Sequence, residues 1–126
     1  MARLTVRTDR APKTLAGYSQ AAIAGGLVFV SGQGPFDPVT GAIVGTTIQE
    51  QTAQCLRNVE EILLAAGSGL DKAVSATFIL GEESDFAGMN EEWNKWFQID
   101  PPARQGAKLP ISPKGMKISI ALIAEA

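Results

Sequence analysis

The sequence predicts an α+β fold in which two helices pack on one face of a single mixed β-sheet. Three observations predict it. Residues 47–66 and residues 84–98 both repeat apolar side chains at helical spacing, and short β-branched segments lie before, between and after these two helices. With 126 residues, the chain has the size of one domain, which we expect to span residues 1–126.

The first predicted elements are two strands followed by a turn. Residues 2–6 alternate weakly between polar and apolar side chains, which indicates a first strand. Residues 27–31 read Leu-Val-Phe-Val-Ser and are bounded by glycines, a pattern typical of a buried strand. Residues 36–41 combine Asp, Pro and Gly, which favours a tight turn.

The clearest helix covers residues 47–66. Thr47 is a suitable N-cap, and Glu50 three residues later completes a capping box. Gly67 stands where a helix commonly ends in the left-handed conformation. Cys55 lies on the apolar stripe of this helix, so we interpret it as a small core residue and not as a reactive thiol.

A strand at residues 73–80 and a second helix follow. Ser84 or Asp85 caps this helix, which extends to about Gln98 and ends before Pro101. We interpret its aromatic cluster as core and not as a platform for stacking bases. The apolar row of the strand is Val74, Ala76, Phe78 and Leu80, and that of the helix is Phe86, Met89, Trp93, Trp96 and Phe97.

Two more strands complete the predicted sheet, at residues 103–109 and 117–124. In the last strand, Ile118, Ile120 and Leu122 share one face, and small or apolar residues such as Ala121 and Ile123 occupy the other. Because both helices cover the same face of the sheet, the second face remains bare. A bare face with apolar residues predicts contact with a partner chain.

The chain contains no histidine and one cysteine. This composition excludes Ser-His-Asp and Cys-His nucleophilic sites, and it excludes the usual zinc ligand sets. We expect no metal and no cofactor. Any chemistry must use arginine, lysine, tyrosine, serine, carboxylates or backbone groups.

The net charge of −2 provides no general attraction to nucleic acid or to an anionic membrane. Arg3, Arg7, Arg10 and Lys13 form a basic start, which is either an arm that touches RNA or, as we favour, solvated charge around an edge strand. No apolar segment approaches the roughly 20 residues of a membrane span. The first residues lack the pattern of a signal or transit peptide, so we expect a cytoplasmic protein.

Arg104 is the strongest candidate for ligand binding. It follows Pro101-Pro102-Ala103, so it enters its strand from a stiff turn, and its guanidinium can bind a carboxylate through two parallel hydrogen bonds. The alternative is a salt bridge at the surface or at a subunit interface. Tyr18 and Ser31, with the backbone near Gly32, supply further groups that can hold a small polar ligand.

Short motifs distributed along nearly the whole chain, with almost no gaps, resemble those of the RidA family, the YjgF-like reactive-intermediate deaminases. The matching segments are Ala11-Pro12, Tyr18-Ser19-Gln20, Phe29-Val30-Ser31-Gly32-Gln33, Pro38-x-Thr40-Gly41, Leu64-Ala65-Ala66-Gly67, Phe86-x-x-Met89-Asn90-x-x-Trp93, Pro102-Ala103-Arg104 and Met116-Lys117-Ile118-x-Ile120-x-x-Ile123-Ala124.

This resemblance implies a chorismate-mutase-like α+β fold and a homotrimer in which the bare sheets form a central barrel. It also implies ligand clefts between subunits, where an arginine binds the carboxylate of a small imino or keto acid and water converts the imine into a keto acid and ammonia. Arg104 matches that arginine. Tyr18, Ser31 and Asn90 match pocket positions, and Gly32 matches a glycine with backbone donors nearby.

Two positions depart from the family pattern. Gly106 stands where the archetype has a cysteine, and Ser119 stands where it has a glutamate thought to activate the attacking water. Serine does not act as a base near neutral pH without a partner. Both replacements suggest a larger pocket and a bulkier ligand. Lys108, which strand alternation places on the face of Arg104, is a candidate second cation.

The leading functional hypothesis is therefore a 2-iminobutanoate/2-iminopropanoate deaminase-type hydrolase. Its substrates are imines or enamines such as 2-aminoacrylate and 2-iminopropionate, with Arg104 as the carboxylate ligand and Ser119 in the catalytic position. One alternative is a non-catalytic trimer that binds small carboxylates such as keto acids. A less favoured one is an endoribonuclease or translation inhibitor, because the chain is acidic and has no histidine and no basic stripe.

Overall fold

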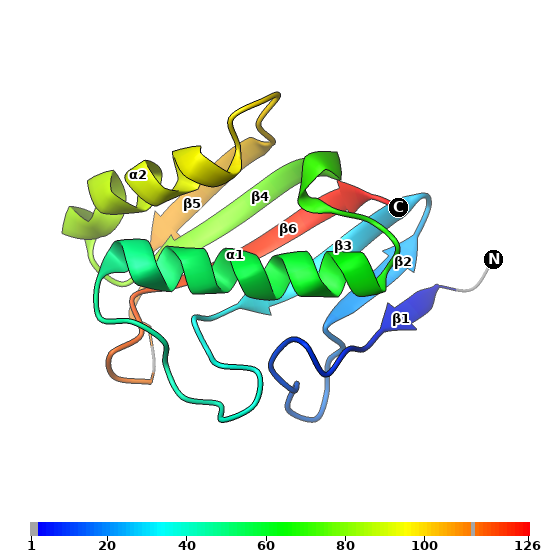
Figure 1. The fold of residues 1–126 in the computed structure, drawn as a ribbon, viewed down its shortest axis with the longest axis horizontal. Coiled ribbons are helices and arrows are strands. Elements are labelled where there is room, and N and C mark those ends of the chain that lie inside the picture. The colour runs from blue at the N-terminus through cyan, green and yellow to red at the C-terminus, as the bar shows by residue number, and fades with distance from the viewer. Residues whose placement is uncertain (1–2, 112) are drawn as a thin grey trace.

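A computed structural model describes residues 3–111 and 113–126. Six strands form one mixed sheet in the order β1-β2-β3-β6-β4-β5, with β4 and β5 parallel and the other neighbours antiparallel. Helices α1 and α2 lie side by side over one face of this sheet (Figure 1). The elements are β1 (Leu4–Val6), β2 (Ala21–Ala24), β3 (Leu27–Gln33), α1 (Ile48–Ala65), η1 (Leu70–Lys72), β4 (Ala73–Leu80), η2 (Glu83–Asp85), α2 (Phe86–Trp96), β5 (Ala103–Lys108) and β6 (Ile118–Glu125). The predicted fold class is confirmed.

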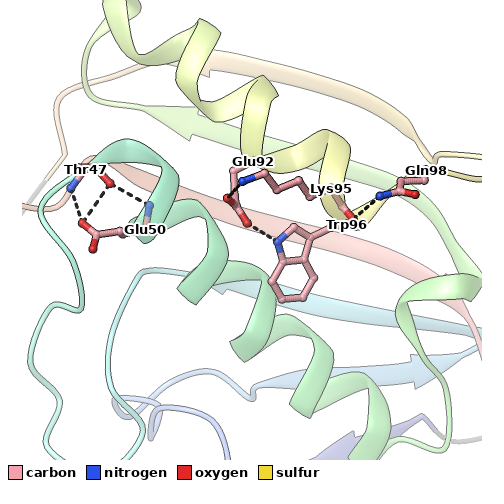
Figure 2. A network of polar contacts seen from close by, with 6 residues as sticks. All are labelled: Thr47, Glu50, Glu92, Lys95, Trp96 and Gln98. Atoms are coloured by element: carbon pink, nitrogen blue, oxygen red, sulfur yellow. Dashed lines mark hydrogen bonds and ion pairs between the residues drawn. The ribbon is translucent and has the colours of Figure 1, made fainter.

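Helix α1 begins where its capping box predicts. The Thr47 side chain accepts a hydrogen bond from the Glu50 amide at 3.1 Å, and Glu50 Oε1 accepts one from the Thr47 amide at 3.1 Å (Figure 2). These two bonds satisfy backbone donors that a helix N-terminus leaves unpaired. Gly67, with a φ of 81°, follows the last turn. The prediction for this helix is confirmed at both ends.

The core lies between α1, α2 and the centre of the sheet. Strand β6 contributes Ile118, Ile120, Leu122 and Ala124, all at most 2% exposed, and the residues that alternate with them face away from the helices. Each fully buried aliphatic side chain contributes about 1.5–3 kcal/mol to the free energy of unfolding. Cys55 is also fully buried in this core, which confirms its interpretation as a core residue.

Three details differ from the predicted elements. Strand β2 is not among the predicted strands, and it exists because it pairs with both β1 and β3. Val74 is 45% exposed and does not share the face of Ala76, because the pairing of β4 with β6 shifts between Ala73 and Ser75. Helix α2 begins at Phe86 after a short 3₁₀ turn, and neither predicted cap residue makes a side-chain capping bond.

The aromatic row of α2 is mostly buried, as predicted. Met89, Trp93 and Phe97 are at most 9% exposed, whereas Phe86 is 44% exposed. The indole N–H of Trp96 donates to Glu92 Oε2 at 2.8 Å, and Glu92 also pairs with Lys95 (Figure 2).

Within the described residues, no helix lies on the second face of the sheet, and we call it the open face (Figure 1). Strand alternation and register place on it side chains that are exposed or half-buried, and those at its centre carry no charge. These central residues are Phe29, Thr77, Ile79, Ala121 and Ile123. Across the described residues, no helix combines the length and the apolar character that spanning a membrane would require.

Candidate active site

Arg104 lies on β5, the edge strand of the sheet, and points to the side that the helices cover. The register pairs Arg104 with Ala76, whose side chain faces the core. Its Nη1 atom donates a hydrogen bond of 2.7 Å to Oδ1 of Asn90 on α2. The structure therefore brings together two of the residues that the family resemblance proposes, one from a strand and one from the helix above it.

Three aromatic rings surround the guanidinium of Arg104. Its central carbon lies 5.2 Å from the ring centroids of Phe78 and Trp93 and 5.8 Å from that of Phe86. A cation within about 6 Å of an aromatic face is attracted by the ring quadrupole. These contacts and the bond to Asn90 hold the side chain from one side, while the residue remains exposed at the edge of the sheet.

The positive charge of Arg104 has no carboxylate partner within 4 Å among residues 3–111 and 113–126. A guanidinium has five N–H donors, and within the described chain only one hydrogen bond of Arg104 is formed. The alternative of a surface salt bridge within the chain is therefore wrong for the described residues, and a salt bridge at a subunit interface is not tested by a single chain. The free N–H groups are suited to a planar anion such as a carboxylate.

Gly106 follows two residues later on the same face, but it does not enlarge a pocket as predicted. A Cβ atom at this position would collide with the ring of Phe78, because Phe78 pairs directly with Gly106 across β4 and β5. The space that the missing side chain leaves is already filled by an aromatic ring. Gly106 therefore does not make room for a bulkier ligand, contrary to the prediction.

Lys108 lies on the face of Arg104, as strand alternation predicts, because its register partner Leu80 also faces the core. It lines a small cavity of about 190 Å³ beside the arginine. Phe78, Phe86 and Gly106 also line this cavity, together with Glu83. We call Arg104, Asn90 and Gly106 the edge group.

Of the other predicted site residues, Ser31 and Gly32 lie in β3 and Ser119 lies in β6. Tyr18 lies in the loop before β2 and lines a cavity with Phe29 of the open face. Strand β3 contains a β-bulge, since Val30 pairs with Leu122 and Gln33 pairs with Ile120, so that an extra residue is accommodated between them. Ser31 and Gly32 occupy this bulge. The Ser31 hydroxyl donates to the Ser19 carbonyl at 2.6 Å, which ties β3 to the segment that carries Tyr18.

Ser119 on β6 lies next to this bulge. A Cβ placed on Gly32 would stand 3.1 Å from Ser119 Oγ, so the two residues are immediate neighbours. Tyr18 is 53% exposed, and it lines a cavity of about 420 Å³ together with Gly32 and another of about 360 Å³ together with Ser31. We call Tyr18, Ser31, Gly32 and Ser119 the open-face group.

Buried polar residues of α1 hold the loop that follows the bulge. Asn58 Nδ2 donates to the carbonyls of Gly34 and Phe36, at 3.1 and 3.0 Å, and Gln54 Nε2 donates to Asn58 Oδ1 at 3.0 Å. A buried backbone oxygen without such a partner would destabilise the loop. This connection fixes one wall of the cavity that Tyr18 and Gly32 line.

The edge group and the open-face group do not form one site within the chain. In the register of the sheet, Ser119 of β6 pairs with Ile79 of β4, and Ile79 pairs with Ala107 of β5. Arg104 lies three residues before Ala107 on β5. With strands ~4.8 Å apart and a rise of ~3.3 Å per residue, the two Cα atoms are ~14 Å apart, and their side chains leave opposite faces. A ligand the size of a small acid cannot contact both within one copy.

Comparisons with known proteins decide the family. Residues 8–126 match the family model described as Endoribonuclease L-PSP. A RutC family protein of Pyrococcus abyssi is 40% identical and is matched over 98% of each chain. The 2-iminobutanoate/2-iminopropanoate deaminase of Rattus norvegicus is 37% identical over 97% of this chain and 89% of the relative. The crystal structure of TdcF from Escherichia coli with bound serine superposes with a TM-score of 0.90 at 33% identity, covering 98% of each chain.

The chain belongs to the RidA family. Membership confirms the resemblance drawn from the motifs, and the family includes relatives named as imine deaminases. The two departures from the RidA pattern now have positions in the structure. Gly106 lies under Phe78 at the sheet edge, and Ser119 lies beside Gly32 on the open face.

Sequence reasoning missed the aromatic surroundings of Arg104. Phe78 and Trp93 both fit the apolar periodicity of their elements. That periodicity does not distinguish a core residue from one that packs against a guanidinium. The one available signal was Gly106, because a glycine inside a strand often marks a close approach of another group. Identifying that group as Phe78 required the register between β4 and β5.

Proposed function

We propose that this RidA-family chain hydrolyses small 2-imino acids and their enamine tautomers to 2-keto acids and ammonia. The observation that carries the proposal is the state of Arg104. Its guanidinium is exposed at the sheet edge, oriented by Asn90, and without a carboxylate partner among the described residues. Such a group binds the carboxylate that every 2-imino acid carries beside its reactive carbon.

The proposed reaction adds one water molecule across the carbon–nitrogen double bond. The water oxygen bonds to the imine carbon, a proton moves to nitrogen, and the carbon–nitrogen bond then breaks as the carbonyl forms. A protonated imine and water thus give a keto acid and an ammonium ion. Because an iminium carbon is already electrophilic, orientation by Arg104 and exclusion of unproductive poses accelerate the addition without a strong base.

Ser119 contributes less to this reaction than a carboxylate would. Its hydroxyl can hold a water molecule through a hydrogen bond but does not remove the proton near neutral pH. General base catalysis is typically worth about 10²–10⁴-fold in rate. We therefore expect a slow deaminase, in which substrate binding depends on Arg104 and the chemical step lacks the contribution of a base at position 119.

A complete site under this proposal takes the edge group from one copy of the chain and the open-face group from another. The separation of the two groups within one chain and the uncharged centre of the open face support this assembly. We propose a homotrimer, as the family resemblance implies. The rat relative named as a deaminase and the serine bound to TdcF, an amino acid with a free carboxylate, are consistent with a small acid as ligand. A cytoplasmic location, in keeping with a single reduced cysteine, is part of the proposal.

A second candidate function is supported by one observation, the serine at position 119. Without a base, the same trimer binds small keto or imino acids and does not turn them over. Under this alternative, Arg104 keeps its role and only the chemical step is absent.

The test uses 2-iminopropionate, generated in the assay by an amino-acid oxidase acting on alanine, with the remaining imine trapped by semicarbazide. We expect the wild-type protein to accelerate hydrolysis and Arg104→Ala to lower kcat/KM by about 10²-fold or more, because two charge-assisted hydrogen bonds are lost. Arg104→Lys is the matched control for charge, since lysine keeps the cation and loses the planar fork, and we expect it to recover little activity.

Ser119→Glu separates the two candidate functions. If wild type is a slow deaminase, this variant turns over faster while Arg104→Ala stays inactive. If wild type binds pyruvate tightly and shows no acceleration at any enzyme concentration, the binding function replaces the deaminase. Wild-type activity that survives Arg104→Ala unchanged would contradict both, because both depend on the same guanidinium.

A further inference from the structure

The position of the Arg104 guanidinium depends on an aromatic ring beside it. Phe78 on β4 and Gly106 on β5 are direct partners in the parallel ladder, and Arg104 precedes Gly106 by two residues on the same face. The ring of Phe78 therefore leans over the strand that carries Arg104. Its centroid lies 5.2 Å from the guanidinium carbon.

Position 106 requires glycine because the Phe78 ring leaves no room for a side chain, and not because of its backbone conformation. It lies within an extended strand, and it is not among the glycines with positive φ. The three atoms nearest to a Cβ built at this position all belong to the ring of Phe78, and all lie far inside van der Waals contact. Any other residue at position 106 must therefore displace this ring.

The ring has little freedom to move without disturbing its neighbours. Phe78 is 7% exposed, and its ring centroid lies 5.9 Å from that of Phe86, which also contacts the guanidinium. Trp93 closes the arrangement at 5.2 Å from the guanidinium carbon. If the Phe78 ring is pushed away from position 106, it moves relative to Phe86 and Trp93, and the surface that contacts the guanidinium changes.

We propose that Phe78 is a positioning residue for Arg104 and that Gly106 exists to admit its ring. The ring acts on the ligand only through Arg104: it fixes the height and tilt of the guanidinium, and Asn90 fixes its rotation. This inference rests on the proposed role of Arg104 as the carboxylate ligand. It assigns to Phe78 and Gly106 a function that neither residue's chemistry reveals.

The experiment measures pyruvate binding by calorimetry and, separately, by the emission of Trp93 in a Trp96→Phe background. Gly106→Ala adds one methyl group beneath Phe78, and we expect about a tenfold or greater rise in the Kd for pyruvate, because small misplacements of a binding group are costly. The emission of Trp93 shifts in the same variant without ligand. Gly81→Ala is the matched control, since the three atoms nearest to its methyl group belong to Ile111, at ordinary contact distances of 3.7 to 3.9 Å.

The double variant Phe78→Leu/Gly106→Ala provides the decisive comparison. Leucine is too short to cover position 106, so the added methyl group no longer meets a ring. We expect Phe78→Leu alone to weaken binding a few-fold, and the double variant to bind pyruvate better than Gly106→Ala alone. Additive losses, or wild-type affinity in Gly106→Ala, would overturn the proposal.

The result can be separated from the fate of the proposed function. If wild type binds no pyruvate, that function fails, and crystal structures then decide the inference. In Gly106→Ala, the proposal requires displacement of the Phe78 ring and loss of the hydrogen bond from Arg104 to Asn90. A structure with this bond and the ring unmoved would refute it. If Gly106→Ala fails to fold, the crystal structure of the double variant is compared with that of wild type. The proposal then requires that the hydrogen bond from Arg104 to Asn90 is changed or lost in the double variant.

Discussion

At the scale of single residues, burial decides what Cys55 can do. The residue is fully buried in α1, and its thiol donates to the Ile118 carbonyl, with 3.7 Å between sulfur and oxygen. Desolvation by burial raises the pKa of the Cys55 thiol far above its ordinary value of 9.0. Because the thiolate is the reactive form, this cysteine is a packing residue even though it is the chain's one sulfur nucleophile.

We therefore expect Cys55 to be inert in the folded protein. At pH 8, an aromatic disulfide reagent should release no colour over hours from native protein, and it should release one equivalent within minutes after denaturation in guanidinium chloride. The native rate should follow global unfolding, since only opening of the core exposes the thiol. Rapid reaction of the native protein, at a rate insensitive to stabilising conditions, would contradict this expectation.

The residues of the candidate site were predictable to different degrees. Arg104 could be selected from the sequence, because a cation after two prolines has a recognisable chemistry. Its partner Phe78 could not, since 26 positions separate the two residues and only the register of β4 with β5 joins them. Likewise, the neighbourhood of Gly32 and Ser119 depends on a bulge in β3 that no local pattern specifies.

At the scale of elements, local signals were sufficient wherever the stabilising contacts are local. The start of α1 was predictable because the hydrogen bonds between Thr47 and Glu50 join residues only three positions apart. Strand β2 was not predictable, because its short run Ala-Ala-Ile-Ala has weak strand propensity and is held by pairing on both sides. The start of α2 falls between these cases, since a 3₁₀ turn replaces the expected side-chain cap.

The capping box also makes the stability of α1 depend on pH. Hydrogen bonds from the Thr47 and Thr46 amides hold the pKa of Glu50 below its ordinary value of 4.5. A carboxylate whose pKa is lower in the folded state stabilises the fold above its unfolded pKa and loses this effect as pH falls through the folded pKa. Urea unfolding between pH 7 and pH 3 should therefore show declining stability below about pH 4.5, with a smaller decline in Glu50→Gln.

Asp37 adds to the same decline and needs its own control. Its pKa is also lowered, first by the Thr40 amide and then by the Val39 amide, which donate to its side chain in the turn. Asp37→Asn should remove that share without affecting the contribution of the helix cap. If the free energy of unfolding falls with pH equally in wild type, Glu50→Gln and Asp37→Asn, neither carboxylate is coupled to unfolding.

At the scale of the whole molecule, the sheet places the two halves of the proposed site on opposite faces. One chain has Arg104, our proposed carboxylate ligand, at the edge on the helix side and a group of hydroxyl and backbone groups on the open face. The centre of the open face combines apolar and uncharged side chains, and covering such a surface with another chain lowers the free energy. Assembly and completion of the site are, under our proposal, the same event.

This coupling yields a prediction that a single substitution can test. Ala121 lies near the middle of the open face, between its register partner Thr77 on β4 and the bulge in β3. Ala121→Glu should leave each chain folded, since the residue faces away from the core, but a buried unpaired carboxylate in an interface costs several kcal/mol and should prevent assembly. Sedimentation equilibrium should then report a trimer of 13.3-kDa chains for wild type and a monomer for the variant.

Activity should disappear together with the assembly, although Arg104, Asn90 and Ser119 all remain in place. Ala87→Glu is the matched control, because Ala87 is exposed on α2 and this variant adds the same charge on the helix side. It should remain trimeric and active. A monomeric Ala121→Glu protein with wild-type kcat/KM for 2-iminopropionate would mean that one chain holds a complete site, and the division of the site between the two faces of the sheet would then have to be abandoned.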